Sequence, residues 1–467
     1  MAPGASFNRG LALLVAITAF MEFLDGTVIQ TAAPAIAREF GVRATDINVA
    51  MTAYLLALAV CIPATGWLAD RFGTRRVYLT AIVAFGVASV LCAFSPDLFW
   101  LCVFRVLQGV GGAMMVPVGR LAVLRSIEPR DLLDAMAYLT WPALLAPVIA
   151  PVVGGVLADT VGWRWIFLIN VPIGIATLIA AIVLVPKADE LRPVPLDWSG
   201  LVLIAVALAG LVMAGELVGE TQADWLAVAV ALVVTVVSGC LFWWRVRRAK
   251  HPVLDFSALR IDTFRAGNAG GGVYRLMIGA VPFLVTLLFQ AGFGWSAAQA
   301  GLIVIALFVG NIGIKPATTP LIKRFGFRTV IVGSNAIGAA ILVALAFVDA
   351  RTPVAVTVVL LVASGAFRSI GFSGYNTIQF VDVPAALTNG ANTLASTMQQ
   401  VAAGLGIAVA ALLVRLGGSL AASVTGDGDW LGYRWAFIGA AALLLIPLFE
   451  AVALRREAGT QATARAS

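Results

Sequence analysis

Apolar stretches of about 20 residues recur along almost the whole chain, and each is long enough to cross a bilayer as a helix. They lie at 10–33, 47–69, 77–95, 99–125, 133–158, 163–185, 197–217, 224–244, 267–291, 298–318, 328–348, 352–375, 387–416 and 432–454. The pattern predicts an all-α polytopic membrane protein with 14 transmembrane helices and both termini on one side of the membrane.

Composition supports this prediction, since 61% of the residues are hydrophobic, 12% are charged and the mean hydropathy is +0.98. The net charge of +7 does not indicate nucleic-acid binding, because the basic residues lie in short loops between apolar stretches. If the N-terminus is inside, the inner segments hold 20 Lys and Arg residues and the outer segments hold six. This bias predicts that both termini are cytoplasmic. We expect the membrane to be a bacterial-type cytoplasmic (inner) membrane.

The loop sequence GWLADRFGTRRVYL (66–79) is echoed by PLIKRFGFRTVIV (320–332), with Arg71 and Arg324 separated by 324 − 71 = 253 residues. The echo predicts two six-helix units and an inserted helix pair. We expect an N-terminal bundle at 1–192, helices 7 and 8 with their flanking loops at 193–250, and a C-terminal bundle at 251–467. Repeated bundles around a central site are typical of alternating-access transporters.

Four stretches carry a resemblance to a known family: LDGTVIQTAAP, GWLADRFGTRR, RVLQGVGGAMMVPVGR, and APVIAPVVGG followed by WRWIFLINVPIG. Together they resemble the major facilitator superfamily, specifically its fourteen-helix drug:proton antiporter branch and the MdtD-like group of multidrug exporters. The resemblance covers nearly the whole chain and implies a major facilitator fold with a 6+2+6 arrangement of helices.

The loop after the second helix is the most specific of these motifs. Its glycines permit close packing and a tight reversal, and Asp70 is expected to pair with Arg71 or Arg75. The resemblance implies a conformational latch that docks near the start of helix 11, whereas the alternative is an ordinary charged turn. The latch residues are Gly66, Asp70, Arg71, Gly73, Arg75 and Arg76. In the second copy Lys323 replaces the acid, so the two loops are not equivalent.

The fifth helix is rich in proline and glycine, with Pro142, Pro147, Pro151, Gly154 and Gly155 in one span. In the family such a helix is associated with antiport. Alanines at 146 and 150 stand where that pattern prefers glycine, so a merely kinked structural helix is an equal alternative.

Charged residues within the spans are the main candidates for function, because each costs about 2.5–3.5 kcal/mol at a helix centre on insertion scales. Two are acids, Glu22 and Asp25, and five are cations, Arg105, Arg120, Arg275, Lys315 and Arg368. Three of the cations lie late in outward-to-inward helices and could instead snorkel to the interface; these are Arg120, Lys315 and, less readily, Arg368.

Asp25 and Arg105 lie within about one helical turn of each other in depth, so the two can form a pair across the N-terminal bundle. Glu22 and Asp25 share a helix face, which makes this a place where substrate binding can alter protonation. The resemblance implies the same proton-coupling role for Asp25 and for Arg105 with Gln108 and Gly109. Glu22 lies outside the family motif and is a second proton site, a ligand for a cationic substrate, or a hydrogen-bonded wall residue.

We therefore expect a proton-coupled secondary transporter that exports drugs or metabolites. The alternative is a carrier of an anionic carboxylate or metal-chelate metabolite, which could be an importer. The expected substrate-binding residues are Glu22, Gln108, Arg120, Tyr274, Arg275, Lys315, Arg368 and Asn376. Acids favour lipophilic cations, whereas the excess of cations favours anions.

No enzymatic constellation is expected, because the chain has one histidine and no phosphate-binding loop. The four cysteines lie in apolar stretches without CxxC spacing, which indicates neither a metal site nor a disulfide. The expected partners are the lipid bilayer, a small-molecule substrate and protons, and we expect no nucleic acid and a functional monomer. The proton gradient is the expected energy source, without a cofactor.

Overall fold

The computed structural model describes residues 8–187, 191, 194–219, 224–425, 429–455 and 457–463. These residues form helices and loops, and no strand occurs among them. The first group of helices consists of α1 (Arg9–Phe40), α2 (Asn48–Cys61), α3 (Thr65–Phe72), α4 (Thr74–Ala93), α5 (Leu98–Ser126), α6 (Leu132–Thr160), α7 (Trp165–Leu168) and α8 (Asn170–Leu184). The pair α9 (Trp198–Gly219) and α10 (Trp225–Val246) follows.

The last group consists of α11 (Asp262–Leu287), α12 (Ala297–Gly313), α13 (Lys315–Ala346), α14 (Val354–Val381), α15 (Thr388–Thr425), α16 (Asp429–Leu443), α17 (Leu445–Ala453) and α18 (Thr460–Thr463). A one-turn π-helix (Leu288–Gly292) extends α11, and a short 3₁₀ segment (Ile62–Ala64) joins α2 to α3.

Within the described ranges, 12 helical segments are long and apolar enough to cross a membrane. Two shorter apolar helices, Val148–Thr160 in α6 and Gln299–Gly313 in α12, complete a one-to-one match with the fourteen predicted spans. The all-α fourteen-helix prediction is therefore confirmed. One boundary was wrong, because the helix continues from Lys315 through the expected loop near 320 and breaks only at Gly326.

The predicted repeat reappears in the backbone. Gly73 has φ 88° and ψ 141°, and Gly326, which is 326 − 73 = 253 residues later, has φ 77° and ψ 161°. Only glycine adopts this conformation without strain. Pro63 and Pro316 have the same separation and lie where the preceding helix is interrupted. Each unit thus builds its second helix, tight reversal and third helix in the same way.

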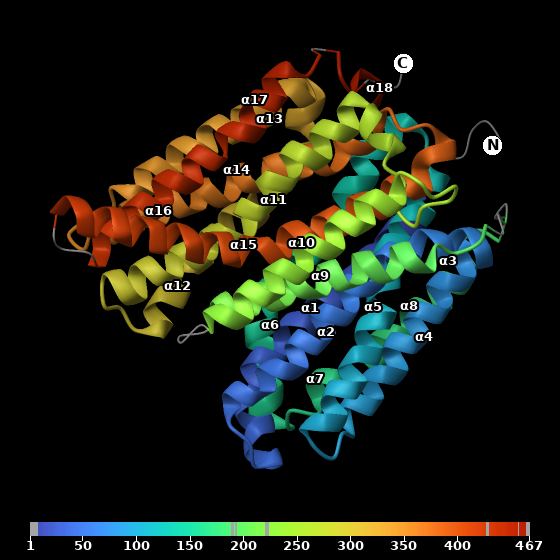
Figure 1. Cartoon of the computed structure of the whole chain (residues 1–467), viewed down its shortest axis with the longest axis horizontal. Coiled ribbons are helices and arrows are strands. Elements are labelled where there is room, and N and C mark those ends of the chain that lie inside the picture. Colours follow the sequence, from blue (N-terminus) through green and yellow to red (C-terminus); the bar gives the residue numbers. More distant parts are fainter. Residues whose placement is uncertain are drawn as a thin grey trace.

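Helices α1–α8 (blue to green-cyan) and α11–α17 (yellow to red) form two groups on opposite sides of the molecule, which we call the first and second halves (Figure 1). Helix α9 packs against α10 and contacts both α2 in the first half and α15 in the second. The predicted boundary between residues 192 and 193 lies outside the described residues, so the exact division stays a prediction.

The start of α1 and the end of α17 lie at the same end of the molecule, which we call the termini end (Figure 1). The ribbons of the two halves converge there and diverge toward the opposite, far end. Large apolar side chains cover the outside, including Val183, Leu226 and Phe449, which are 77%, 75% and 69% exposed. Such a surface is stable only in contact with lipid.

Candidate functional site

The ion pair expected from helix depth is present in the first half. Arg105 Nη1 lies 2.5 Å from Asp25 Oδ2, and the two residues are 0% and 1% exposed. Asp25 comes from α1 and Arg105 from α5, so the pair joins the first helix of the half to its fourth span. A buried charge is tolerated only when it is paired and hydrogen-bonded, and this pair meets both conditions for the carboxylate.

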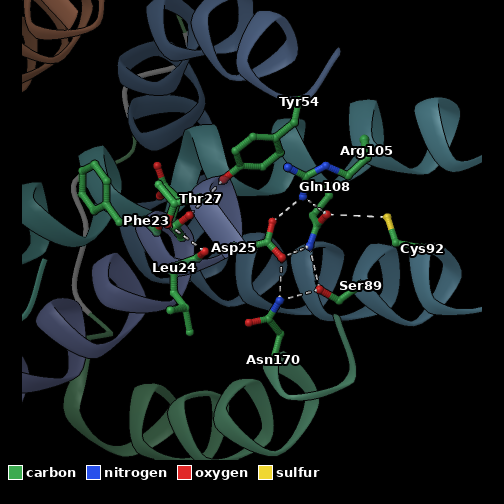
Figure 2. Close-up of polar contacts among 11 residues, drawn as sticks. Phe23, Leu24, Asp25, Thr27, Tyr54, Ser89, Cys92, Arg105, Gln108 and Asn170 are labelled. Carbon is green, nitrogen blue, oxygen red and sulfur yellow. Dashed lines mark hydrogen bonds and ion pairs between the residues drawn. The ribbon is translucent and has the colours of Figure 1, made fainter. Parts of the chain in front are cut away.

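Neutral amides complete the environment of Asp25 (Figure 2). Gln108 Nε2 and Asn170 Nδ2 donate to Asp25 Oδ1 at 2.9 and 2.8 Å. The same two nitrogens donate to Ser89 Oγ at 2.7 and 3.0 Å, and Gln108 Oε1 accepts from Arg105 Nη1 at 2.8 Å. The two amides therefore hold Oδ1 of the Asp25 carboxylate and Arg105 holds Oδ2, so donors fix both oxygens.

An aromatic ring covers the guanidinium of this cluster. Arg105 Cζ lies 4.1 Å from the ring centroid of Tyr54 on α2, which is a cation–π distance. Gly109 lets α2 approach, because a Cβ there would lie 2.6 Å from the carbonyl oxygen of Tyr54. Arg105 Nε and Nη2 have no hydrogen-bond partner among the described residues, so the guanidinium depends on Asp25 for its charge compensation.

Glu22 lies one turn before Asp25 on α1 and is also buried, at 8% exposed. Its Oε2 is buried and finds no partner within the described part of the chain. Gly112 of α5 lies beside Glu22, since a Cβ there would lie 3.6 Å from Glu22 Cγ. The two acids predicted to act together therefore differ sharply, because Asp25 is held by donors and Glu22 keeps a free oxygen.

The predicted latch residues lie at the termini end. Asn389 Nδ2 on α15 donates to the carbonyl oxygen of Gly66 at 2.9 Å, and a Cβ on Gly66 would collide with Thr393 Oγ1. The latch therefore docks at the start of α15, which is the thirteenth of the fourteen spans. The expectation that it docks near the start of helix 11 was wrong. This contact requires glycine because the two helices approach closely.

The expected partner of Asp70 was also wrong. Asp70 Oδ1 pairs with Arg125 Nη2 at the end of α5, at 3.2 Å. The reversal at Gly73 sends Arg75 the other way, so that its Nη2 donates to the carbonyl oxygen of Ile182 at 2.5 Å.

The two remaining latch arginines lie on the surface. Arg71 lies over Trp67 at 5.7 Å, and Arg76 is exposed. In the second copy of the loop the base Lys323 stands in place of the acid, and its Nζ lies 2.9 Å from Asp134 Oδ2 on α6. This ion pair joins the two halves, whereas the pair of Asp70 with Arg125 lies within the first half.

The predicted substrate-binding residues do not form one group. Gln108 belongs to the Asp25 cluster. In the second half, Arg275 Nη2 donates to Asn376 Oδ1 at 2.7 Å, and the Tyr274 hydroxyl donates to the carbonyl oxygen of Phe367 at 2.9 Å. Arg368 Nη2 donates to the carbonyl oxygen of Ile278.

Two further predicted residues lie between the halves. Arg120 on α5 reaches α15, where its Nε donates to Asn392 Oδ1 at 2.7 Å. Lys315 Nζ donates to Ser373 Oγ at 2.7 Å and borders a cavity of about 810 Å³ between α6 and α13. Both side chains are buried, at 7% and 6% exposed, so neither snorkels to the interface as the alternative required.

Several polar residues in these contacts were missed by the sequence analysis. Asn170 and Ser89 bind the Asp25 cluster, and Asn392 bonds across the halves to Arg120 and to the carbonyl oxygen of Pro117, the latter at 2.8 Å. Asn170 and Ser89 are isolated polar residues in apolar helices, which is a signal of a buried partner in a membrane protein.

Comparisons with known proteins agree with this fold. The profile of the Major Facilitator Superfamily matches residues 15–244 and 268–466. The "Putative multidrug resistance protein MdtD" of Shigella boydii serotype 4 (strain Sb227) is 35% identical over 437 residues, which cover 93% of this chain and 92% of the relative. The protein of the same name from Escherichia coli O6:H1 (strain CFT073) is 34% identical with the same coverage.

Two solved structures share the fold at low sequence identity. The human organic anion transporter MFSD10 (TETRAN) has a TM-score of 0.63 at 15% identity and covers 95% of this chain and 97% of its own. The proton:xylose symporter XylE has a TM-score of 0.59 at 14% identity and covers 94% of both chains. The chain belongs to the Major Facilitator Superfamily and is a multi-pass membrane transporter.

Proposed function

We propose that the chain is a proton-coupled exporter of small organic molecules that works by alternating access in a bacterial cytoplasmic membrane, with both termini in the cytoplasm. The relatives named as multidrug resistance proteins support export. The excess of basic residues in the segments on the termini side supports the orientation. Export is then transport from the termini end to the far end.

The observation that carries the proposal is the buried ion pair of Asp25 and Arg105. A proton that reaches Asp25 neutralises the carboxylate and removes the only ion-pair partner of Arg105 within the described residues. The attraction between α1 and α5 then weakens, which shifts the balance between two arrangements of the half. Glu22, one turn away with a free oxygen, supplies a neighbouring position for the same proton.

Contacts between the halves support alternating access. The bonds from Asn389 to Gly66 and from Arg120 to Asn392, and the pair of Lys323 with Asp134, join the halves toward the termini end. This arrangement corresponds to a state in which the halves are joined at the termini end. Release of these contacts would open the termini end and admit substrate from the cytoplasm.

The test uses the purified protein in proteoliposomes with an imposed pH gradient and an internal pH-sensitive dye, with ethidium and citrate as the two probes. Wild type should move protons when one of the probes is added. Asp25→Asn should lose gradient-driven transport but retain exchange of the probe across equal concentrations, because exchange needs no net proton movement. The matched control is Glu39→Gln, which alters an exposed acid at the far end.

Retained exchange shows that the variant is folded, so a loss of coupling alone supports the assignment. Gradient-driven transport by Asp25→Asn at the wild-type rate would contradict it. Probe transport in wild type without any proton movement would contradict proton coupling as a whole. Movement of the probe only from the far end to the termini end would establish an importer.

A further inference from the structure

Two buried arginines, one from each half, lack an ion-pair partner in the part of the chain that the structure describes. Arg120 on α5 and Arg275 on α11 are 7% and 5% exposed, and we call them the arginine pair. Both reach the end of α14, where Arg120 packs against Phe380 and Arg275 bonds to Gln379. Among the described residues neither forms an ion pair, in contrast to Arg105, whose guanidinium has a carboxylate at 2.5 Å.

The end of α14 brings the arginine pair together. Arg120 Cζ lies 5.5 Å from the ring centroid of Phe380. One residue earlier, Gln379 Oε1 accepts from Arg275 Nη2 at 3.3 Å, and one turn earlier Asn376 Oδ1 accepts from the same nitrogen at 2.7 Å. The Arg275 side chain extends toward the termini end, since its Nη1 also donates to the carbonyl oxygen of Gly267 at 3.1 Å.

Within the described ranges, the acceptors that compensate these charges are all neutral. Arg120 uses Asn392 Oδ1 and Ser396 Oγ on α15, at 2.7 and 2.5 Å, and Arg275 uses two side-chain amides and a carbonyl oxygen. Arg275 Nε remains buried without a partner in the described structure. Two like charges without a counter-ion in a membrane are costly, and such residues are kept for a functional reason.

We propose that the arginine pair is a substrate site between the two halves that binds a carboxylate anion. A guanidinium is planar and offers parallel donors that match the two oxygens of a carboxylate, which Lys does not. Two guanidiniums from opposite halves suit a molecule with two or more carboxylates. The inference rests on the proposed transport function, because it names the chemical class of the molecule that is carried.

The site also connects binding to opening. Arg120 uses its nitrogens on α15 in the present arrangement, and these bonds help to hold the termini end together. A carboxylate that takes the same nitrogens competes with Asn392 and Ser396 and so releases α15 from α5. Binding of the anion therefore favours the arrangement that is open at the termini end, and the neutral acceptors replace the anion after it has left.

The experiment measures binding to the purified full-length protein in detergent, by thermal shift and by calorimetric titration, with succinate and citrate as carboxylate probes and ethidium as the cationic probe. Wild type should bind a carboxylate probe. Arg120→Gln and Arg275→Gln should each lower the affinity by about 10- to 100-fold, since each loses charged hydrogen bonds to the ligand. The exposed Arg324→Gln is the matched control and should leave the affinity unchanged.

A measurement on wild type alone covers the case in which a variant does not fold. Dimethyl succinate has the shape of succinate without its charges and should not bind. Equal affinity for the ester, wild-type affinity in both arginine variants, or binding of ethidium with no carboxylate binding at all would each overturn the inference.

Failure of this inference and failure of the proposed function give different results. Proton-coupled transport of ethidium without carboxylate binding would remove the anion site and leave the transporter proposal standing. Carboxylate binding that depends on the arginine pair, without proton movement in proteoliposomes, would support the site and remove proton coupling.

Discussion

Replacement of Asp25 by Asn should destabilise the folded protein far more than loss of an exposed acid. All the donors that surround Asp25 point at its two oxygens: Arg105 at one, Gln108 and Asn170 at the other. Asparagine has one oxygen and one NH₂ group. In either orientation its NH₂ faces a donor, which is Arg105 on one side or Gln108 and Asn170 on the other. The substitution therefore breaks the ion pair and also creates an unfavourable contact between two donors.

The cost follows from burial. Removal of one partner from a buried pair leaves an uncompensated charge and costs about 3–5 kcal/mol. Here Arg105 is 0% exposed, and without Asp25 its charge would keep only the neutral acceptor Gln108 Oε1 among the described residues. The Glu39 pair with Arg164 is close at 2.6 Å, but its side chains are 43% and 39% exposed, so Glu39→Gln should cost about 0.2–1 kcal/mol.

The assay is equilibrium unfolding in detergent micelles with increasing denaturant, which gives the free energy of unfolding for wild type and variants. The double variant Asp25→Asn/Arg105→Gln removes both charges and should recover part of the loss, since no charge remains buried alone. An Asp25→Asn variant within 1 kcal/mol of Glu39→Gln would refute this reasoning. A double variant as unstable as the sum of the two single variants would refute it as well.

Two further predictions concern contacts between the halves. Gly66→Ala should prevent closure at the termini end, because the added Cβ collides with Thr393. The control Gly86→Ala should leave closure unchanged, because its Cβ meets no atom within 4 Å. Labelling of a cysteine at the start of α15 should therefore rise in Gly66→Ala and not in Gly86→Ala. Lys323→Glu should increase the same labelling by repulsion from Asp134, and the swap Lys323→Glu/Asp134→Lys should restore the wild-type level, although the exposed pair is worth only about 0.2–1 kcal/mol.

The helices could be predicted from the sequence because the bilayer fixes their length and composition. The repeat relates the break at Gly326 to the reversal at Gly73, but the continuation of the helix from Lys315 through Pro320 could not be predicted, because proline is unfavourable inside a helix. The pairing of Asp25 with Arg105 was predictable from depth alone. Asn170 was not, because depth does not give the rotation of a helix about its axis.

Contacts between distant helices set the remaining limit. Asp70 was expected to pair within its own loop, where sequence separation is small, but the structure uses Arg125, which is 55 residues away. The partner of Arg120 is 272 residues away on α15. A sequence pattern identifies such residues as unusual for a membrane helix, yet only the packed halves show whether a buried cation has an acid, an amide or no charged partner.

The repeat itself shows how the two halves divide these roles. Glu22 and Arg275 have the separation of 253 residues that relates Gly73 to Gly326, and so do Asp70 and Lys323. At both positions an acid in the first half corresponds to a base in the second. At the first of these positions, Glu22 neighbours the proposed proton site, and Arg275 joins Arg120 of the first half in the proposed anion site. In the alternating access proposed above the halves move against each other, so an event at either charge would change the contacts that both halves form at the termini end. In the proposed transporter, coupling between proton and substrate then needs no shared residue, only two charged sites that favour different arrangements of the same pair of bundles.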